Sequence, residues 1–158
     1  MNAPVQNPIT GNEPVEDLSN PVQALSEFYN AFNGREFSLM EQNWIASPEA
    51  SMSNPLGGIR RGWEEIKTVY QNIFVGTARV YVEYYDYTIA QGEGFFQAVG
   101  RERGYFEIGE TCIDLKIRTS RTFVMQEGRY KQLHHHGSIE EPELLAHYQQ
   151  GVLALKEA

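Results

Sequence analysis

Residues 111–138, TCIDLKIRTSRTFVMQEGRYKQLHHHGS, decide the fold of this 158-residue chain. Two strand-like runs flank the turn dipeptide Glu127-Gly128, which predicts a long antiparallel hairpin. Side chains on a strand alternate between its two faces, so every second residue of the first run shares a face. One face is polar. The other face is apolar apart from a Thr and an Arg, and it is expected to point inward: Ile113, Leu115, Ile117, Thr119, Arg121, Phe123 and Met125.

Arg121 is the unusual member of this inward face, because a buried guanidinium is costly unless acceptors meet its hydrogen bonds. Two interpretations stay open. Arg121 can be a structural arginine, paired with a buried Glu or with backbone carbonyls. It can also line a pocket and bind the anionic group of a ligand, for which its planar fork of donors is suited.

Composition excludes several classes of function. The formal net charge of −8 argues against a nucleic-acid partner, because phosphates demand a basic face. The single Cys112 cannot form an internal disulfide. No apolar run approaches the roughly 20 residues of a membrane span, and no signal peptide is visible. We therefore expect a cytoplasmic protein with neither a membrane nor a nucleic-acid partner.

The N-terminal part of the chain differs in composition from the rest. Prolines among Asn, Gly and Glu, with few apolar residues, predict a disordered or draped tail over residues 1–18. Asn20-Pro21 then indicates a helix start, with Asn as N-cap, Pro at the first helical position and Gln23 as capping-box partner. We interpret residues 19–158 as a single domain.

Helical patterns up to Gly76 give way to strand patterns from about Arg79. Turn signals at residues 91–94, 109–110 and 127–128 separate four strands, and Pro142 starts a last helix. One short strand, residues 50–54, precedes them. The predicted fold class is α+β, with the helices packed in the concave face of a curved antiparallel sheet.

This order of elements resembles the nuclear transport factor 2-like superfamily. The resemblance spans roughly Pro21 to Ser138 and is carried by Asn54-Pro55-Leu56-Gly57, by residues 119–123 and by residues 133–138. The superfamily includes ketosteroid isomerases, SnoaL-type polyketide cyclases and the association domain of calcium/calmodulin-dependent protein kinase II. The resemblance implies a SnoaL-like domain: a cone-shaped half-barrel with an interior pocket, dimerising through the outer sheet face.

Isomerases of this superfamily use an Asp base after the first strand and two oxyanion donors, a Tyr and a protonated Asp. Matching by motif places the base on Asn54, the Tyr on Phe28, next to Tyr29, and the Asp on or beside Arg121. Asn cannot abstract a proton near neutral pH and Phe cannot donate a hydrogen bond. Ketosteroid isomerisation is therefore disfavoured. The kinase association domain has an Arg facing the pocket at the position of Arg121.

The three consecutive histidines divide between the two faces of their strand. Counting from Leu133, His135 points to the pocket, whereas His134 and His136 share the outer face with Tyr130 and Gln132. His135 is either a general base, because imidazole titrates near neutral pH, or a satisfied buried histidine. The outer pair lacks further metal ligands. We expect no metal and no cofactor, and a homodimer through the outer face.

The expected function is the binding of a small, largely apolar molecule that carries an anionic group, with or without acid–base chemistry of isomerase, lyase or hydrolase type. Arg121 would bind the anion, and His135 and Asn54 would orient the ligand or transfer protons. The other predicted ligand contacts are Phe28, Tyr29, Trp44, Met52, Ile117, Thr119 and Phe123. The alternative is a non-enzymatic association domain. An open cavity of a few hundred Å³ would favour a ligand, and a filled one would favour a scaffold.

Overall fold

The computed structural model describes residues 3–157, with side chains described for residues 3–155, so residues 1, 2 and 158 of the predicted tail and domain lie outside it. Four helices and six strands follow in the order α1 (Pro21–Asn33), α2 (Phe37–Asn43), β1 (Ser51–Ser53), β2 (Arg60–Arg61), α3 (Trp63–Val75), β3 (Arg79–Gly92), β4 (Phe95–Ile108), β5 (Thr111–Gln126), β6 (Arg129–Ile139) and α4 (Pro142–Glu157). The predicted α+β class is confirmed. Among the described residues, no helix is long and apolar enough to cross a membrane.

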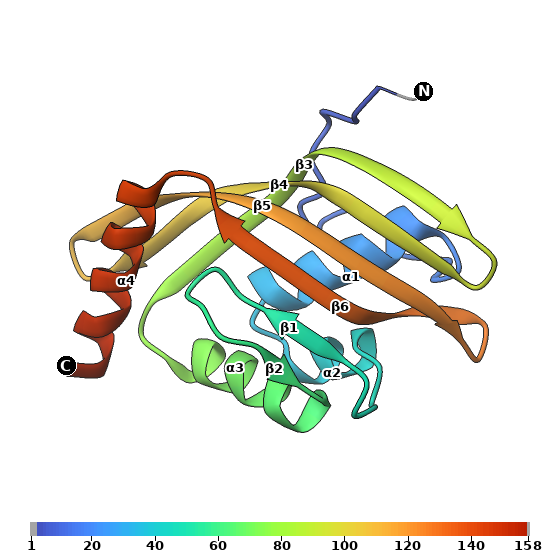
Figure 1. Cartoon of the computed structure of the whole chain (residues 1–158), viewed down its shortest axis with the longest axis horizontal. Coiled ribbons are helices and arrows are strands. Elements are labelled where there is room, and N and C mark those ends of the chain that lie inside the picture. The colour runs from blue at the N-terminus through green and yellow to red at the C-terminus, as the bar shows by residue number, and fades with distance from the viewer. Residues whose placement is uncertain (1–2, 158) are drawn as a thin grey trace.

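The strands form one curved sheet in the order β2-β1-β6-β5-β4-β3. The four long strands are consecutive antiparallel neighbours, as predicted, and β1 joins them by pairing parallel to β6. The helices α1, α2 and α3 lie together on one side of the sheet, and α4 lies at the left-hand end of the sheet in the view of Figure 1. The space between sheet and helices holds the core.

Helix α1 begins where the sequence predicts. The Asn20 side chain accepts hydrogen bonds from the backbone N–H groups of Val22 and Gln23 at 3.0 and 3.3 Å. Gln23 is not the expected capping-box partner. Its side-chain oxygen instead accepts from the backbone N–H groups of Glu16 and Asp17 at 2.6 and 2.8 Å, because the preceding segment folds back over the helix start.

That preceding segment runs along the edge of β3. Val5 forms an antiparallel bridge with Tyr87, and Ile9 forms another with Tyr84. Ile9 is also buried in the core. The Glu13 carboxylate accepts hydrogen bonds from the backbone of this segment and from Ser26 of α1, which fixes the segment to the helix.

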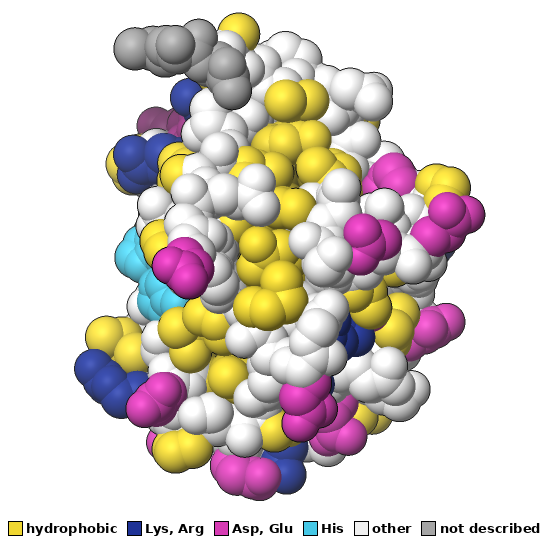
Figure 2. All heavy atoms as spheres, turned by 90° about the vertical axis from the view of Figure 1, so that its right-hand side faces the viewer, with side chains coloured by type: hydrophobic (Ala, Val, Ile, Leu, Met, Phe, Trp, Pro, Cys, Tyr) yellow, Lys and Arg dark blue, Asp and Glu magenta, His cyan; other side chains and the backbone are white. Residues whose placement is uncertain are grey.

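The inward face of β5 matches the prediction along most of its length. Leu115, Ile117, Thr119, Arg121 and Phe123 are all buried. Met125, next in this series, is 37% exposed. It lies close to the hairpin turn, where the sheet extends past the helices (Figure 1). At this end of the molecule apolar side chains form a central band, with acidic side chains on both sides of it and below (Figure 2).

The prediction for β6 is wrong at two residues. Tyr130 and Gln132 are buried on the inner face, although His134 and His136 lie on the outer face as expected. The cause is a β-bulge: Thr122 pairs with His134 and Phe123 with Gln132, which leaves Leu133 as an extra residue. One extra residue in a strand moves the side chains of the residues before it to the opposite face of the sheet.

Candidate functional site

A row of side chains crosses the inner face of the sheet. Residues paired directly across neighbouring strands share a face. The register places in one row Ala98 of β4, Arg121 of β5, His135 of β6, Met52 of β1 and Arg60 of β2. The first four are buried and Arg60 is exposed, so the row leads from the core to the surface.

A cavity of about 750 Å³ lies against this row, between the sheet and the helices α1, α3 and α4. Much of its wall is apolar and includes Phe28, Phe32, Val69, Ile73, Tyr148 and Val152. Asn54, Glu102, Arg121 and His135 are among its polar lining groups. A cavity of this volume with a few convergent polar groups has the character of a small-molecule site, for which about 300–1,000 Å³ is typical.

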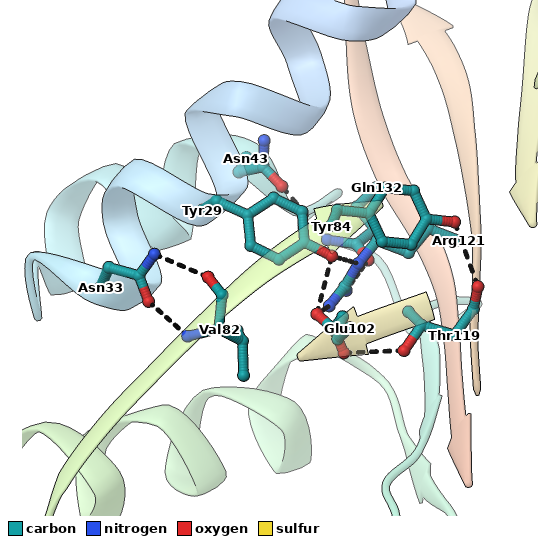
Figure 3. A network of polar contacts seen from close by, with 9 residues as sticks. All are labelled: Tyr29, Asn33, Asn43, Val82, Tyr84, Glu102, Thr119, Arg121 and Gln132. Atoms are coloured by element: carbon teal, nitrogen blue, oxygen red, sulfur yellow. Dashed lines mark hydrogen bonds and ion pairs between the residues drawn. The ribbon is translucent and has the colours of Figure 1, made fainter. Parts of the chain in front are cut away.

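The guanidinium of Arg121 is held by side chains of the protein itself (Figure 3). Nη2 donates to Glu102 Oε2 at 3.1 Å, Nη1 donates to Gln132 Oε1 at 2.7 Å, and Nε donates to the Tyr29 hydroxyl at 3.3 Å. The guanidinium carbon lies 3.7 Å from the Phe28 ring centroid. These contacts favour the structural interpretation of Arg121, because Glu102 already balances its charge. The binding of a ligand anion by Arg121 stays a prediction.

Glu102 is the functional neighbour that the sequence prediction missed. Its carboxylate accepts from Tyr29 Oη and from Thr119 Oγ1, both at 2.7 Å, in addition to Arg121. Burial opposes the charge of Arg121, but Tyr29 and Glu102 outweigh it, so the pKa of Arg121 lies above its ordinary value. Alternation along β4 offered a signal, because Glu102 shares the inward face of Phe96, Ala98 and Phe106.

The polar network continues away from the cavity through the helices. Gln132 Nε2 donates to Asn43 Oδ1 at 3.2 Å, and Asn43 Nδ2 donates to Glu27 Oε1 at 2.9 Å. Arg129 forms an ion pair with Glu27. The ion pairs Arg121–Glu102 and Arg129–Glu27 thus lie at the two ends of one continuous series of hydrogen bonds. The Arg121 guanidinium is hydrogen-bonded to side chains of both neighbouring strands, β4 and β6.

His135 differs from Arg121 in having no partner. It is 8% exposed and lines the cavity, and neither buried ring nitrogen has a hydrogen-bond partner among the described residues. Burial lowers its pKa well below the ordinary 6.5, and Arg121 and the flanking histidines lower it further. The imidazole is therefore neutral near pH 7. A neutral imidazole offers one N–H donor and one acceptor nitrogen.

A family model described as a SnoaL-like domain matches residues 22–141. The chain belongs to the SnoaL-like family. This agrees with the predicted resemblance.

Solved structures share the fold of this SnoaL-like chain at low identity. A candidate calcium/calmodulin-dependent protein kinase type II association domain from Thiobacillus denitrificans is 18% identical, with a TM-score of 0.64, over 82% of this chain and 100% of that chain. A candidate dehydratase of the nuclear transport factor 2-like family from Streptomyces avermitilis is 15% identical, with a TM-score of 0.67, over 73% and 90%. A candidate ketosteroid isomerase from Shewanella frigidimarina is 15% identical, with a TM-score of 0.63, over 74% and 93%. Such likeness shows the fold alone, and no curated protein matched.

The cavity of this SnoaL-like domain is lined by some of the residues predicted to contact a ligand. Phe28, Met52, Asn54 and Ile117 line it beside His135. Asn54 follows β1, and its side-chain oxygen accepts the backbone N–H of Leu56 at 3.0 Å. Its amide N–H₂ meets no acceptor within the described chain, and an amide of this kind can donate to a ligand.

Four predicted contacts of the SnoaL-like domain do not line the cavity. Tyr29 and Thr119 lie behind its wall, bound to Glu102. Trp44 stacks on Trp63 and Phe123 on Phe96, with ring centroids 6.4 and 4.8 Å apart. These four side chains are buried elsewhere in the core and do not face the cavity.

The outer face of the sheet carries His134 and His136. Ser51 Oγ and His134 Nδ1 form a hydrogen bond of 2.7 Å, and His136 is exposed. Among the side chains of residues 3–155, no group of three or more His, Cys, Asp or Glu residues is arranged to hold a metal ion.

Proposed function

We propose that the protein binds a small, largely apolar molecule in the cavity, with a neutral hydrogen-bonding group of that molecule placed against His135. The observation that carries the proposal is the buried, neutral imidazole of His135 beside a cavity of about 750 Å³. A buried polar atom without a partner costs about 1–3 kcal/mol. A ligand hydroxyl or carbonyl that met the imidazole would recover part of that free energy.

The ion pair in the wall argues that the inner end of the ligand is neutral. Arg121 and Glu102 both line the cavity and balance one another at 3.1 Å. A carboxylate placed at this depth would approach the Glu102 carboxylate, and an ammonium would approach the Arg121 guanidinium. Because charges are costly to bury without a partner of their own, a hydroxyl or carbonyl fits better than either.

Acid–base chemistry would depend on His135. Its neutral form can accept a proton, but its lowered pKa makes it a weak base. Proton transfer of isomerase or lyase type would therefore need an already acidic C–H group, such as one beside a carbonyl. The Asn54 amide, on the same cavity wall, would donate to that carbonyl.

The outer sheet face supports a second function, self-association. A surface groove of about 610 Å³ crosses it, lined by Val99, Arg118 and His136 among others. Val99, on the outward face of β4, is 48% exposed. Apolar surface at the centre of a mostly polar face is characteristic of contact surfaces between proteins. We propose a homodimer through this face, which would leave the cavity free to bind a ligand.

Ligand binding is tested by displacing a neutral environment-sensitive dye from the cavity. Medium-chain alcohols and methyl ketones should compete about five- to tenfold better than alkanes of equal length, because they meet His135. The variant His135→Phe should lose this preference and still bind the dye. His136→Phe, on the outer face, is the matched control and should behave like wild type. Equal competition by alkanes and ketones in the wild type would count against the proposal.

A further inference from the structure

Arg60 forms a second polar element of the cavity, at its rim. It lines the cavity from β2 and is exposed to solvent. Within the described chain its guanidinium has no carboxylate partner, unlike Arg121 deeper in the same cavity. The rim therefore carries an uncompensated positive charge in a protein whose net charge is −8.

The register of β1 and β2 determines which arginine faces the cavity. Met52 pairs with Arg60, and Ser51 pairs with Arg61. Met52 is buried and lines the cavity, so Arg60 shares its face. Arg61 points the other way, toward the side on which Ser51 contacts His134.

We propose that the ligand carries an anionic group at the end remote from His135, and that Arg60 binds this group at the rim. The inference rests on the proposed ligand-binding function and specifies the class of ligand. His135 pairs with Met52 and Met52 pairs with Arg60, so two strand spacings separate the two polar ends. At about 4.8 Å per spacing, the ligand needs an apolar body of about 10 Å between them.

Solvation favours this orientation over the reverse. A carboxylate that entered first would lose its water and approach Glu102, whereas at the rim it stays partly hydrated and meets a cation. The planar fork of an arginine binds a carboxylate through two parallel hydrogen bonds. The ligand class is thus an amphiphilic carboxylic acid with a hydroxyl or carbonyl at its far end. The anionic group expected from the sequence has its partner in Arg60, not in Arg121.

The test uses ω-hydroxydecanoic acid and its methyl ester, which share the hydroxyl end and the apolar body and differ by a methyl group and by the charge of the outer end. Both should displace the dye from the wild type, with the acid about three- to tenfold tighter, as a partly exposed ion pair would give. The advantage of the acid should shrink as salt is added, whereas the affinity of the ester should not. Arg60→Gln should make acid and ester equal. Arg61→Gln, the neighbour on the opposite face, should leave the difference intact.

The outcomes separate the inference from the function on which it rests. If acid and ester bind wild type and Arg60→Gln alike, the role of Arg60 is overturned while ligand binding at His135 stands. If Arg61→Gln removes the difference as fully as Arg60→Gln does, the effect is general surface charge and the inference also fails. If neither compound displaces the dye from the wild type, ligand binding itself is contradicted, and with it the role of Arg60.

Discussion

The guanidinium of Arg121 lies 3.1 Å from the carboxylate of Glu102, and the two side chains are only 2% and 5% exposed. The partners come from neighbouring strands and are 19 residues apart in the chain. Loss of one member of a buried pair leaves the other as an uncompensated charge in the core, which costs about 3–5 kcal/mol.

Arg121→Met should therefore lower the free energy of unfolding by about 3–5 kcal/mol, measured by urea denaturation. Arg79→Met is the control, because Arg79 is exposed at the start of β3, outside the proposed dimer contact, and should change stability by less than about 0.5 kcal/mol. The double variant Arg121→Met, Glu102→Leu should recover part of the loss. A single variant as stable as wild type would contradict the account of Arg121 as a structural residue.

Stability should decrease in mild acid because of His135. Folding lowers the pKa of this side chain well below 6.5, so the unfolded chain binds a proton in a pH range in which the native imidazole does not. The contribution of His135 to the free energy of unfolding is complete above pH 6.5 and falls as the pH drops toward the native pKa, by up to about 1.4 kcal/mol per pH unit. Urea midpoints between about pH 7.5 and pH 5 measure this slope.

The variant His135→Gln isolates the contribution of that residue to the pH dependence. Gln keeps a polar side chain of similar size but does not titrate, whereas His134, whose pKa burial also lowers, is present in both proteins. The variant should show a shallower loss of stability below pH 6.5 than wild type. Identical slopes would show that the acid sensitivity arises elsewhere.

No appreciable isomerisation of a β,γ-unsaturated ketosteroid is expected. Asn54 stands where the resemblance places the catalytic base, and an amide cannot take up the proton. Loss of a well-placed base typically lowers the rate by about 10²–10⁴-fold. An ultraviolet assay for the conjugated product should record the background rate, and efficient turnover by the wild type would refute the prediction.

Val99→Glu should convert the proposed dimer to a monomer, because it would bury an unpaired charge in the contact. Sedimentation velocity at micromolar concentration measures the change. Val75→Glu is a suitable control, since Val75 is 82% exposed at the cavity rim, away from the outer sheet face. A monomeric wild type at that concentration would rule out the contact.

Local signals in the sequence predicted most of the fold. Turn dipeptides fixed the hairpins, and the cap at Asn20 fixed the start of α1, because these effects depend on residues close in the chain. Alternation identified Arg121 and His135 as inward residues, since a period of two needs only the strand itself.

The rest of the site depends on relations between distant residues. The pairing of Arg121 with Glu102 requires knowing which strands are neighbours and how far each side chain reaches. The inward position of Gln132 depends on the bulge at Leu133, and nothing in the local pattern marks that extra residue. Trp44 and Phe123 are large aromatic residues of the kind that line ligand pockets, but in the structure they pack against other aromatic rings. Only the tertiary contacts reveal this packing.

The segment along β3 has a consequence for how the protein behaves in a concentrated solution. An open sheet can recruit a strand from another molecule wherever a long edge presents free backbone groups. Here one edge is β2, which is only two residues long, and the other is the 14-residue β3, against which Val5 and Ile9 already pair. The N-terminal segment thus covers the β3 edge to which another molecule could otherwise add a strand. A variant that releases Ile9 would expose this edge as a template for aggregation.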